Sequence, residues 1–508
     1  ATWNDPDGLV RHTADVVTDR VAGPRPRLLL SGQWDFAEGA PLFLTPLPAP
    51  ETFRENAVAV PGYMPFHHRG PQHVGWYRKR FVVPDWLSAE RRMLRFGTVS
   101  YECEVYVNGQ RVGHHFGPKD AFEFDVTDAL RPGTNEVLVG VRDWVAAAPE
   151  DGLRRLAASA EFRESAARKE FHISVLESVA GLRAPSWDTL GGIKDDVCLE
   201  GRSGVHVADL FVQPSVRQRS LAVDVAVTNA SARAATVTPV CTILDRGKPM
   251  LEFKGAAVTL PPGGGQVVRL EAPFPDAPLW WPHDPRLLHC RVALTGAGDV
   301  ADVRFGFREV WFEGQRFLFN GRVAKMTRTG YNPYAPSHMT RRALRAMAAR
   351  TPPFGVPIAE VPNSLLMSAD ICDEEGLLWD LETNWVICGP STRIIQNDVY
   401  WRNAELLAAA VARTFRNHAC VVHYNHSNEF GCFAEYTNVE DGSKFAFERL
   451  FGVYAAVRAV DPTKPGHSDA DGDLGGRLPD FNLHYPIDTV PGLLVQNRAF
   501  VAPVDAFN

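Results

Sequence analysis

The stretch RNHACVVHYNHSNEF (Arg416–Phe430) decides the fold class of the last part of this chain. A short apolar run inside it, Cys420 to Val422, has polar residues on both sides, which is typical of a buried strand. The stretch closes on Asn428 and Glu429. A carboxylate at the carboxyl end of a barrel strand is where (β/α)8 folds carry their chemistry. We therefore predict a parallel α/β fold here, with Glu429 as the first candidate for a functional side chain.

The segments around this stretch alternate between helical and strand patterns from Trp311 onward, which indicates βα units and a parallel sheet. Gly376 and Pro465 follow two of the helical patterns and are expected to end those helices. The predicted helices cover 340–350, 369–376, 404–416 and 445–465, and the predicted strands cover 317–321, 377–382, 420–422 and 480–486. This order predicts a parallel sheet with helices between its strands.

Upstream of Trp311 the pattern changes to short β-runs separated by turns. Residues 1–200 predict an antiparallel sandwich, and the dipeptide Asn108-Gly109 is the strongest short hairpin signal in it. An Ala-rich, charged segment near 146–185 interrupts these runs and predicts a helical insertion. Residues 201–310 return to evenly spaced strands, which predicts a small immunoglobulin-like β-sandwich.

The bulk composition excludes several classes of protein. The chain has 508 residues and a formal net charge of −7, without a basic run, so it gives no support for nucleic acid or anionic membrane as a partner. No apolar stretch approaches the ~20 residues that span a bilayer. The start, Ala1-Thr2-Trp3, has no signal-peptide pattern, but a removed signal peptide would leave the same sequence. We expect a soluble protein, cytoplasmic or exported.

The eight cysteines are scattered and form no CxxC pair, so their spacing predicts no metal site. A dense disulfide framework is also not expected in a chain of this length. Cys241 and Cys290 fall in the same predicted β-domain, and we expect free buried thiols there rather than a disulfide.

The segment from His418 to Glu429 resembles the acid/base signature of glycoside hydrolase family 2, the family of β-galactosidases, β-glucuronidases and β-mannosidases. The motifs WYR, VNG, FEFDVT and GGIKDDV occur in the order expected for the sugar-binding jelly roll of that family. The resemblance implies three domains: a jelly-roll β-sandwich (1–200), an immunoglobulin-like β-sandwich (201–310) and a catalytic (β/α)8 TIM barrel (311–508). The order of helices and strands matches that barrel up to about its sixth strand, so the barrel is incomplete in this sequence.

The resemblance also implies an activity, the hydrolysis of a terminal β-linked sugar with retention of configuration. Glu429 would be the general acid/base, and Asn428 would hydrogen-bond the 2-hydroxyl of the sugar, a contact that strengthens in the transition state. Positions at predicted strand ends add further candidates for substrate binding: Asn332, Glu382, Trp385, His484 and Tyr485. We expect a carbohydrate as the partner and no cofactor or metal; relatives in the family imply a homo-oligomer.

Retaining glycosidases need a second carboxylate as nucleophile, about 5–5.5 Å from the first. The family uses a Glu at the end of strand seven, and no Glu follows Glu448 in this sequence. One explanation is that strands seven and eight lie beyond Asn508, because a six-stranded barrel would leave an open edge. A second is that Asp505 is the nucleophile on a displaced strand. A third is that the protein is not a retaining hydrolase.

Departures from the family pattern keep two rival functions open. Tyr424 stands where Trp is usual, and His423 and His426 stand where apolar or small residues are common. The segment at 354–364 lacks the Arg and His of the usual sugar-binding loop. The first rival is a non-catalytic carbohydrate-binding protein on the same scaffold, and the second is a glycosidase whose site is completed by another chain.

Overall fold

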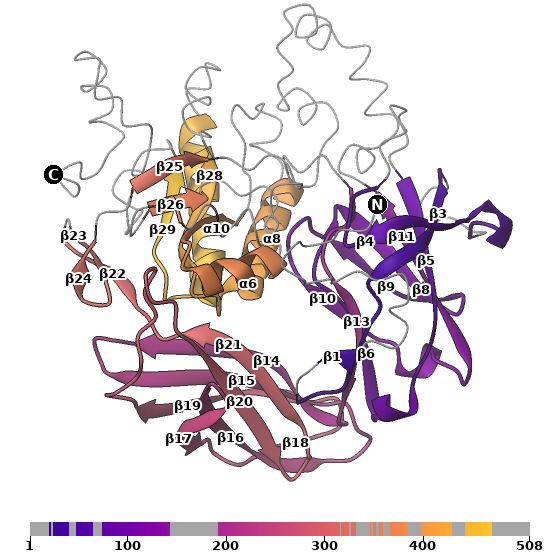
Figure 1. Cartoon of the computed structure of the whole chain (residues 1–508), viewed down its shortest axis with the longest axis horizontal. Helices are drawn as coiled ribbons and strands as arrows, with labels where there is room; N and C mark the ends of the chain where they lie inside the picture. Colours follow the sequence, from indigo (N-terminus) through magenta and orange to yellow (C-terminus); the bar gives the residue numbers. More distant parts are fainter. Residues whose placement is uncertain are drawn as a thin grey trace, which may run out of the picture.

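The computed structural model describes residues 20–21, 24–39, 47–64, 74–142, 191–314, 316–324, 327–331, 346, 349–351, 355–358, 366–383, 398–428 and 442–469. These residues form two antiparallel β-sandwiches and a parallel sheet with helices packed on it (Figure 1). In Figure 1 the first sandwich is indigo to purple, the second is magenta, and the parallel sheet and its helices run from orange to yellow.

The first sandwich consists of a six-stranded and a five-stranded sheet, with a small two-stranded sheet beside them. The six-stranded sheet has the order β4 (Arg54–Val60), β3 (Gly32–Glu38), β5 (Val74–Val82), β11 (Thr134–Arg142), β8 (Glu102–Val107) and β9 (Gln110–Phe116). The five-stranded sheet has the order β1 (Arg20–Val21), β2 (Arg27–Leu29), β13 (Val197–Arg202), β6 (Arg91–Phe96) and β10 (Phe122–Asp125). The remaining elements are β12 (Gly192–Ile193), β7 (Val99–Ser100) and the 3₁₀ turns η2 (Pro50–Thr52), η3 (Asp85–Leu87) and η4 (Thr127–Ala129).

The hairpin predicted at Asn108-Gly109 is confirmed. Strands β8 and β9 pair antiparallel with Val107 opposite Gln110. Asn108 and Gly109 have φ angles of 51° and 82°, and positive values at both turn residues match the right-handed twist of the flanking strands. The predicted helical insertion near 146–185 lies outside the described residues.

The second sandwich packs a three-stranded sheet against a five-stranded one. The three-stranded sheet has the order β14 (Val205–Ser215), β15 (Ser220–Asn229) and β19 (Gly265–Pro273). The other has the order β17 (Lys248–Lys254), β16 (Ala235–Asp245), β20 (Leu287–Thr295) and β21 (Val300–Gly306), with β18 (Val258–Leu260) also paired to β16. Cys241 and Cys290 lie in its core with their Sγ atoms 3.4 Å apart and not bonded, which confirms the prediction of free buried thiols.

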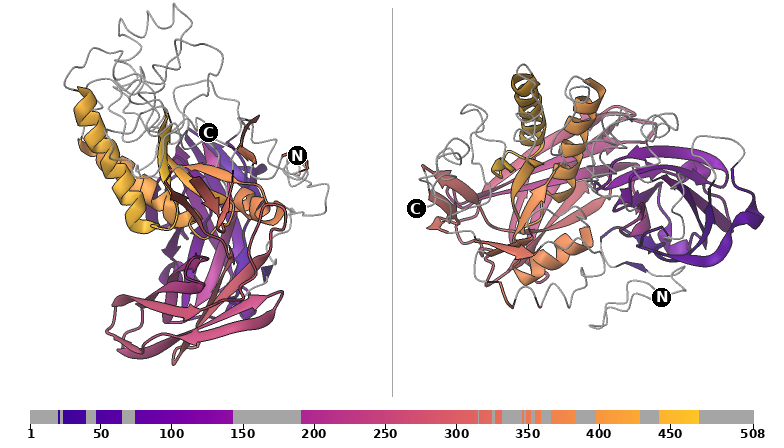
Figure 2. Two further views of the ribbon diagram at one scale, coloured as in Figure 1. Left: turned by 90° about the vertical axis from the view of Figure 1, so that its left-hand side faces the viewer. Right: turned by 90° about the horizontal axis from the view of Figure 1, so that it is seen from above.

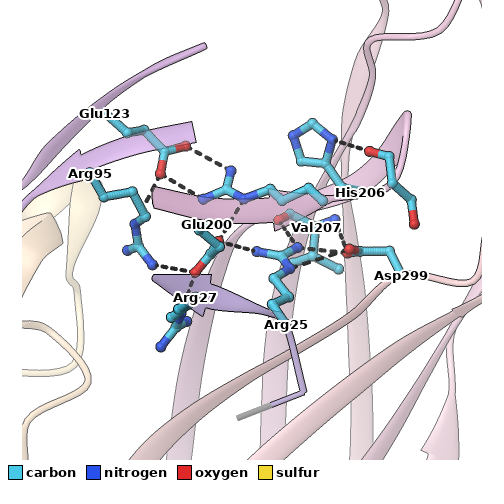
Figure 3. A network of polar contacts seen from close by, with 10 residues as sticks. Arg25, Arg27, Arg95, Glu123, Glu200, His206, Val207 and Asp299 are labelled. Atoms are coloured by element: carbon cyan, nitrogen blue, oxygen red, sulfur yellow. Dashed lines mark hydrogen bonds and ion pairs between the residues drawn. The ribbon is translucent and has the colours of Figure 1, made fainter. Parts of the chain in front are cut away.

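A buried network of charges joins the two sandwiches (Figure 3). At its centre is Glu200 of β13, whose side chain is fully buried. The guanidinium groups that bind its carboxylate belong to Arg25, Arg27, Arg95 and Arg202. Arg25 also bonds Asp299 of the second sandwich at 2.6 Å, so one arginine connects carboxylates from both domains.

The second sandwich leads through a small antiparallel sheet into the parallel sheet. The small sheet contains β22 (Val310–Glu313), β23 (Arg316–Phe319) and β24 (Arg322–Val323). The parallel sheet has the order β25 (Thr327–Tyr331), β26 (Gly355–Ile358), β27 (Trp379–Glu382), β28 (Val421–Asn428) and β29 (Gly466–Asp469). Its helices are α6 (Leu366–Glu375), α8 (Asp398–Phe415) and α10 (Gly442–Val460), and Figure 2 shows α8 and α10 side by side next to the sheet.

Three helices predicted from the sequence are present with shifted ends. Gly376 has a φ of +72° and follows the last residue of α6, as its C-terminal position predicts. Helices α8 and α10 begin a few residues before the predicted starts. Strand β28 is longer than the apolar run that predicted it, because polar residues continue the strand as far as Asn428. The predicted helix at 340–350 falls mostly, and the predicted strand at 480–486 wholly, outside the described residues.

The two faces of the parallel sheet differ in character. Trp379 and Leu381 of β27 pack with α8 in one apolar cluster, which defines the outer face. Asp380 and Glu382 alternate with them and therefore point to the opposite side, which we call the inner face. The end of the second sandwich lies below the inner face, where the fully buried Trp280 packs with Val422. Trp280 is thus a packing residue.

Candidate functional site

The carboxyl ends of β27 and β28 lie side by side, and they carry the first candidate residues. Glu382, the last residue of β27, is opposite Asn425 in the parallel register. Its side chain is buried, with an exposed fraction of 1%. Asn428 is the last residue of β28 and pairs with Asp469 of β29. The sequence-predicted Glu382 and Asn428 therefore occupy the same edge of the sheet.

The first sandwich brings a cation to Glu382. The turn after β9 packs against α8, where the backbone N–H of Ala121 donates to Oγ1 of Thr414 at 3.1 Å. Lys119 on this turn is buried, and burial lowers the pKa of its ammonium group, although the carboxylate of Glu382 opposes that shift. Lys194 is buried close to Lys119, and burial together with the charge of Lys119 holds the pKa of Lys194 well below its usual value.

The start of β28 is fixed by a second buried carboxylate, Asp373 of α6. Asp373 accepts hydrogen bonds from the backbone N–H of Cys420 at 2.7 Å and from Nδ1 of His418 at 2.8 Å. Burial disfavours both charges, but the pairing lowers the pKa of Asp373 and raises the pKa of His418 relative to their ordinary values. This pair fixes the chain where β28 begins, at the opposite end of the strand from Asn428.

The outer side of β28 is held by a second hydrogen-bonded group. The hydroxyl of Tyr424 donates to Asp461 at 2.6 Å, and Lys464 donates to the same carboxylate at 2.7 Å. Burial lowers the pKa of Lys464 to about 8, although Asp461 opposes the shift. Tyr424, where the family pattern usually has Trp, thus has a polar partner for its hydroxyl.

A third buried carboxylate, Asp380, lies on the inner face one layer below Glu382. It accepts hydrogen bonds from His423 of β28 at 2.8 Å and from His467 of β29 at 2.9 Å. Burial disfavours the carboxylate, but the two imidazoles hold the pKa of Asp380 well below its usual range. Asn425 is on the same face of β28, next to Glu382 in register.

Only part of the predicted site can be placed. Glu382 is described in full, and the backbone of Asn428 is described as the end of β28. The other predicted residues lie outside the described residues: Asn332, Trp385, Glu429, His484, Tyr485 and Asp505. Sequence reasoning missed Lys119 altogether, and it recorded His423 only as a departure from a pattern. A buried polar residue at an inward-facing strand position would have been the signal for His423 and Asp380.

The described residues include no helix with the length and apolar character needed to cross a bilayer. The described residues form two β-sandwiches followed by a parallel sheet, with a buried carboxylate at the carboxyl end of β27.

Two family models match within the sandwiches: "Glycosyl hydrolases family 2, sugar binding domain" over residues 60–154, and "Glycosyl hydrolases family 2" over residues 205–308. A β-galactosidase of Arthrobacter sp. (strain B7) is 28% identical over 428 residues, which is 78% of this chain but 34% of that protein. The chain therefore spans about a third of the length of this curated relative.

Solved structures show the same fold. The β-glucuronidase of Bacteroides uniformis has a TM-score of 0.67 at 19% identity, covering 88% of this chain and 52% of its own. A family 2 β-galacturonidase of Eisenbergiella tayi has a TM-score of 0.66 at 19% identity, covering 89% of this chain and 72% of its own. Taken with the two family models, these matches show that the chain is similar to glycoside hydrolases of family 2 and shares their fold.

Proposed function

We propose that the protein is a retaining glycoside hydrolase that removes a terminal β-linked sugar, with Glu429 as the general acid/base. The observation that carries this proposal is the end of β28 at Asn428, on the same sheet edge as the buried Glu382. Glu429 is the next residue in the chain after Asn428. The relatives named β-galactosidase and β-glucuronidase support a glycosidase of this kind.

The proposal includes closure of the parallel sheet into a (β/α)8 barrel. Five parallel strands in sequence order with helices on one face are the repeating pattern of that fold. Catalytic groups of such barrels gather at the carboxyl ends of several strands. Glu382 and Asn428 come from neighbouring strands at that end.

The chemistry requires Glu429 to be protonated when the sugar binds, so that it can donate to the leaving oxygen as the glycosidic bond breaks. A carboxylate on the opposite side of the sugar forms the covalent intermediate, and Glu429 then takes a proton from the attacking water. Within this sequence Asp505 is the candidate nucleophile, and a carboxylate beyond Asn508 is the alternative. Asn428 would donate to the sugar 2-hydroxyl.

Glu382 has a different role in this proposal. As a buried acceptor at the strand end, it would bind a sugar hydroxyl, and the charge of Lys119 in the first sandwich would favour its ionised form. The first sandwich would then complete the substrate site across the domain boundary, which fits a turn docked on α8.

The variant Glu429→Gln tests the proposal with nitrophenyl β-glycosides. Loss of the acid/base should lower kcat/KM by about 10²–10⁴-fold on a substrate with a poor leaving group. On a substrate with an activated leaving group, added azide should restore turnover by attacking the glycosyl intermediate. The matched control is Glu448→Gln, because Glu448 is exposed on α10 and should leave the rate unchanged. An unchanged rate in Glu429→Gln would remove Glu429 from the mechanism.

The rival function is sugar binding without cleavage. A protein of that kind would show no turnover in the wild type, and both variants would bind sugars equally in calorimetry. Departures at His423 and His426 from the family pattern are the observation that favours keeping this rival in view.

A further inference from the structure

Three neighbouring strands each place one metal-binding type of side chain at the same point of the inner face. Asp380 comes from β27, His423 from β28 and His467 from β29. One ligand atom from each lies within 4.8 Å of the other two. All three side chains are buried, with exposed fractions of 1–3%. Two imidazoles and a carboxylate therefore converge in the dry interior of the sheet.

The geometry is close to what a small cation requires. Oδ1 of Asp380 is 2.8 Å from Nδ1 of His423 and 2.9 Å from Nε2 of His467. Metal–ligand distances of about 2.0–2.2 Å for zinc place neighbouring ligand atoms only slightly further apart than these hydrogen bonds. A small outward rotation of the rings would open the position between the three atoms.

A slip in the sheet register brings His423 to this point. Trp379 pairs with Val421, but Asp380 pairs with His423, so β28 has one extra residue between the two pairs. Irregularities of this kind re-aim a side chain and are frequent next to functional sites. Without the slip, Asp380 would be opposite the apolar Val422, which packs below the inner face.

The next layer of the inner face supplies a second, independent observation. Asn425 is fully buried, and its Oδ1 accepts from the backbone N–H of Ser427 at 3.3 Å. Among the described residues, its Nδ2 has no hydrogen-bond partner. A buried amide N–H without an acceptor costs about 1–3 kcal/mol, so an occupant with an oxygen atom between the two layers would relieve a real penalty.

We propose that Asp380, His423 and His467 bind one divalent transition-metal ion, with zinc as the first candidate. Zinc takes imidazole nitrogen and carboxylate oxygen at such distances, and three protein ligands leave one position for water. The oxygen of that water is an acceptor of the kind that Asn425 lacks. Calcium and magnesium prefer sites made of oxygen ligands only, so two imidazoles exclude them.

A second cluster of similar composition helps to define the proposal. Asp373, His418 and Cys420 also lie within reach of one another. There the carboxylate is already bound by the backbone N–H of Cys420 and by His418, and these bonds fix the start of β28. The carboxylate of Asp373 therefore already binds a backbone N–H, whereas the described bonds to Asp380 come from two imidazoles.

The metal would act as a structural tie. It would link β27, β28 and β29 two residues before Glu382 and would hold the sheet edge that carries the proposed glycosidase site. This inference does not depend on the glycosidase activity, because metal content and stability can be measured in a protein that cleaves nothing.

The test is the metal content of the full chain, expressed with zinc supplementation and dialysed against metal-free buffer. Elemental analysis should find about one equivalent of zinc per chain, and a chelator should lower Tm until zinc is added back. Bound Co²⁺ should give a visible d–d spectrum. The variants Asp380→Asn and His423→Gln should bind zinc at least ~10-fold more weakly, because even outer partners of metal ligands have effects of that size.

The matched control is His418→Gln in the Asp373 cluster, which should retain the zinc. If His418→Gln lost the zinc and His423→Gln retained it, the ion would belong to the Asp373 cluster, and the proposal would be overturned. A wild-type protein without stoichiometric zinc, whose Tm responds neither to zinc nor to chelator, would also overturn it. The zinc content and Tm of the wild type are measured without any variant, so they test the proposal even if a variant fails to fold.

Discussion

Two buried carboxylates, Glu200 between the sandwiches and Asp380 in the parallel sheet, are satisfied in different ways. Glu200 is surrounded by arginines, whose charges are fixed at any ordinary pH (Figure 3). Asp380 is bonded by His423 and His467, whose ring nitrogens belong to a group that also binds metals. The comparison teaches that the carboxylate between the two sandwiches is paired with arginines alone, whereas the carboxylate inside the parallel sheet is paired with side chains of a metal-binding type.

Among the variants that test this comparison, Glu200→Gln should lower the free energy of unfolding most. The change leaves several buried guanidinium groups without their carboxylate, which typically costs about 3–5 kcal/mol of unfolding free energy. Denaturant titration measures the loss. The control is Glu38→Gln, because Glu38 pairs with Arg54 at the surface and should lose no more than about 1 kcal/mol. Equal losses in the two variants would contradict the role given to Glu200.

The next effect concerns Lys119 of the first sandwich, whose charge interacts with that of Glu382. Lys119→Met keeps the length of the side chain but removes the charge, so Glu382 should lose its orientation. Under the proposed function, kcat/KM should fall by about 10–100-fold, as for other misplacements of an active-site group, and its pH profile should shift. Lys119→Arg should restore much of the loss. A fall in stability with unchanged kinetics would make Lys119 a packing residue only.

A smaller effect is expected from the His418–Asp373 pair. The pKa of His418 is raised in the folded protein, so its pairing stabilises the fold fully below the unfolded pKa of about 6.5. That contribution is lost as pH rises from there through the folded pKa. The free energy of unfolding of the wild type, measured relative to His418→Gln, should therefore decrease across this window. If the difference in unfolding free energy between the wild type and His418→Gln did not change with pH, the pair would carry no titrating charge.

The smallest effect is expected at the hairpin of the first sandwich. A Cβ at Gly109 meets no atom within 4 Å, so only its φ of +82° opposes a side chain. Gly109→Ala should cost about 1–2 kcal/mol by thermal or denaturant unfolding. The control is Gly204→Ala. Gly204 has no φ in the left-handed region, but its added Cβ would lie 2.4 Å from the carboxylate of Glu90, so this variant tests a close contact and not the backbone angle.

Local signals account for the elements that the sequence predicted. The Asn108-Gly109 turn and the helix stop at Gly376 depend on the backbone of one or two residues, and both are present as predicted. The apolar run Cys420 to Val422 covers only the first part of β28, because an apolar run marks a strand only where both faces are apolar. Polar residues line the inner face beyond Val422.

The tertiary pairings could not be predicted in the same way. Lys119 and Glu382 belong to different domains, and nothing in the sequence near either residue indicates the other. The convergence of Asp380, His423 and His467 depends on a register slip in β28 that no periodicity reveals. Glu382 was predicted because a carboxylate after an apolar strand is a local signal.

The most direct test of the central claim, that the edge formed by β27 and β28 is a retaining glycosidase site, is trapping of the covalent intermediate. The natural polypeptide is incubated with 2-deoxy-2-fluoro β-glycosides of the sugars that it cleaves, and the labelled peptide is identified by mass spectrometry. We predict one glycosyl ester on a single carboxylate, either Asp505 or a residue beyond Asn508. Trapping should also occur in Glu429→Gln with an activated leaving group. A wild type that binds sugars but neither turns over β-glycosides nor forms an adduct would contradict the account.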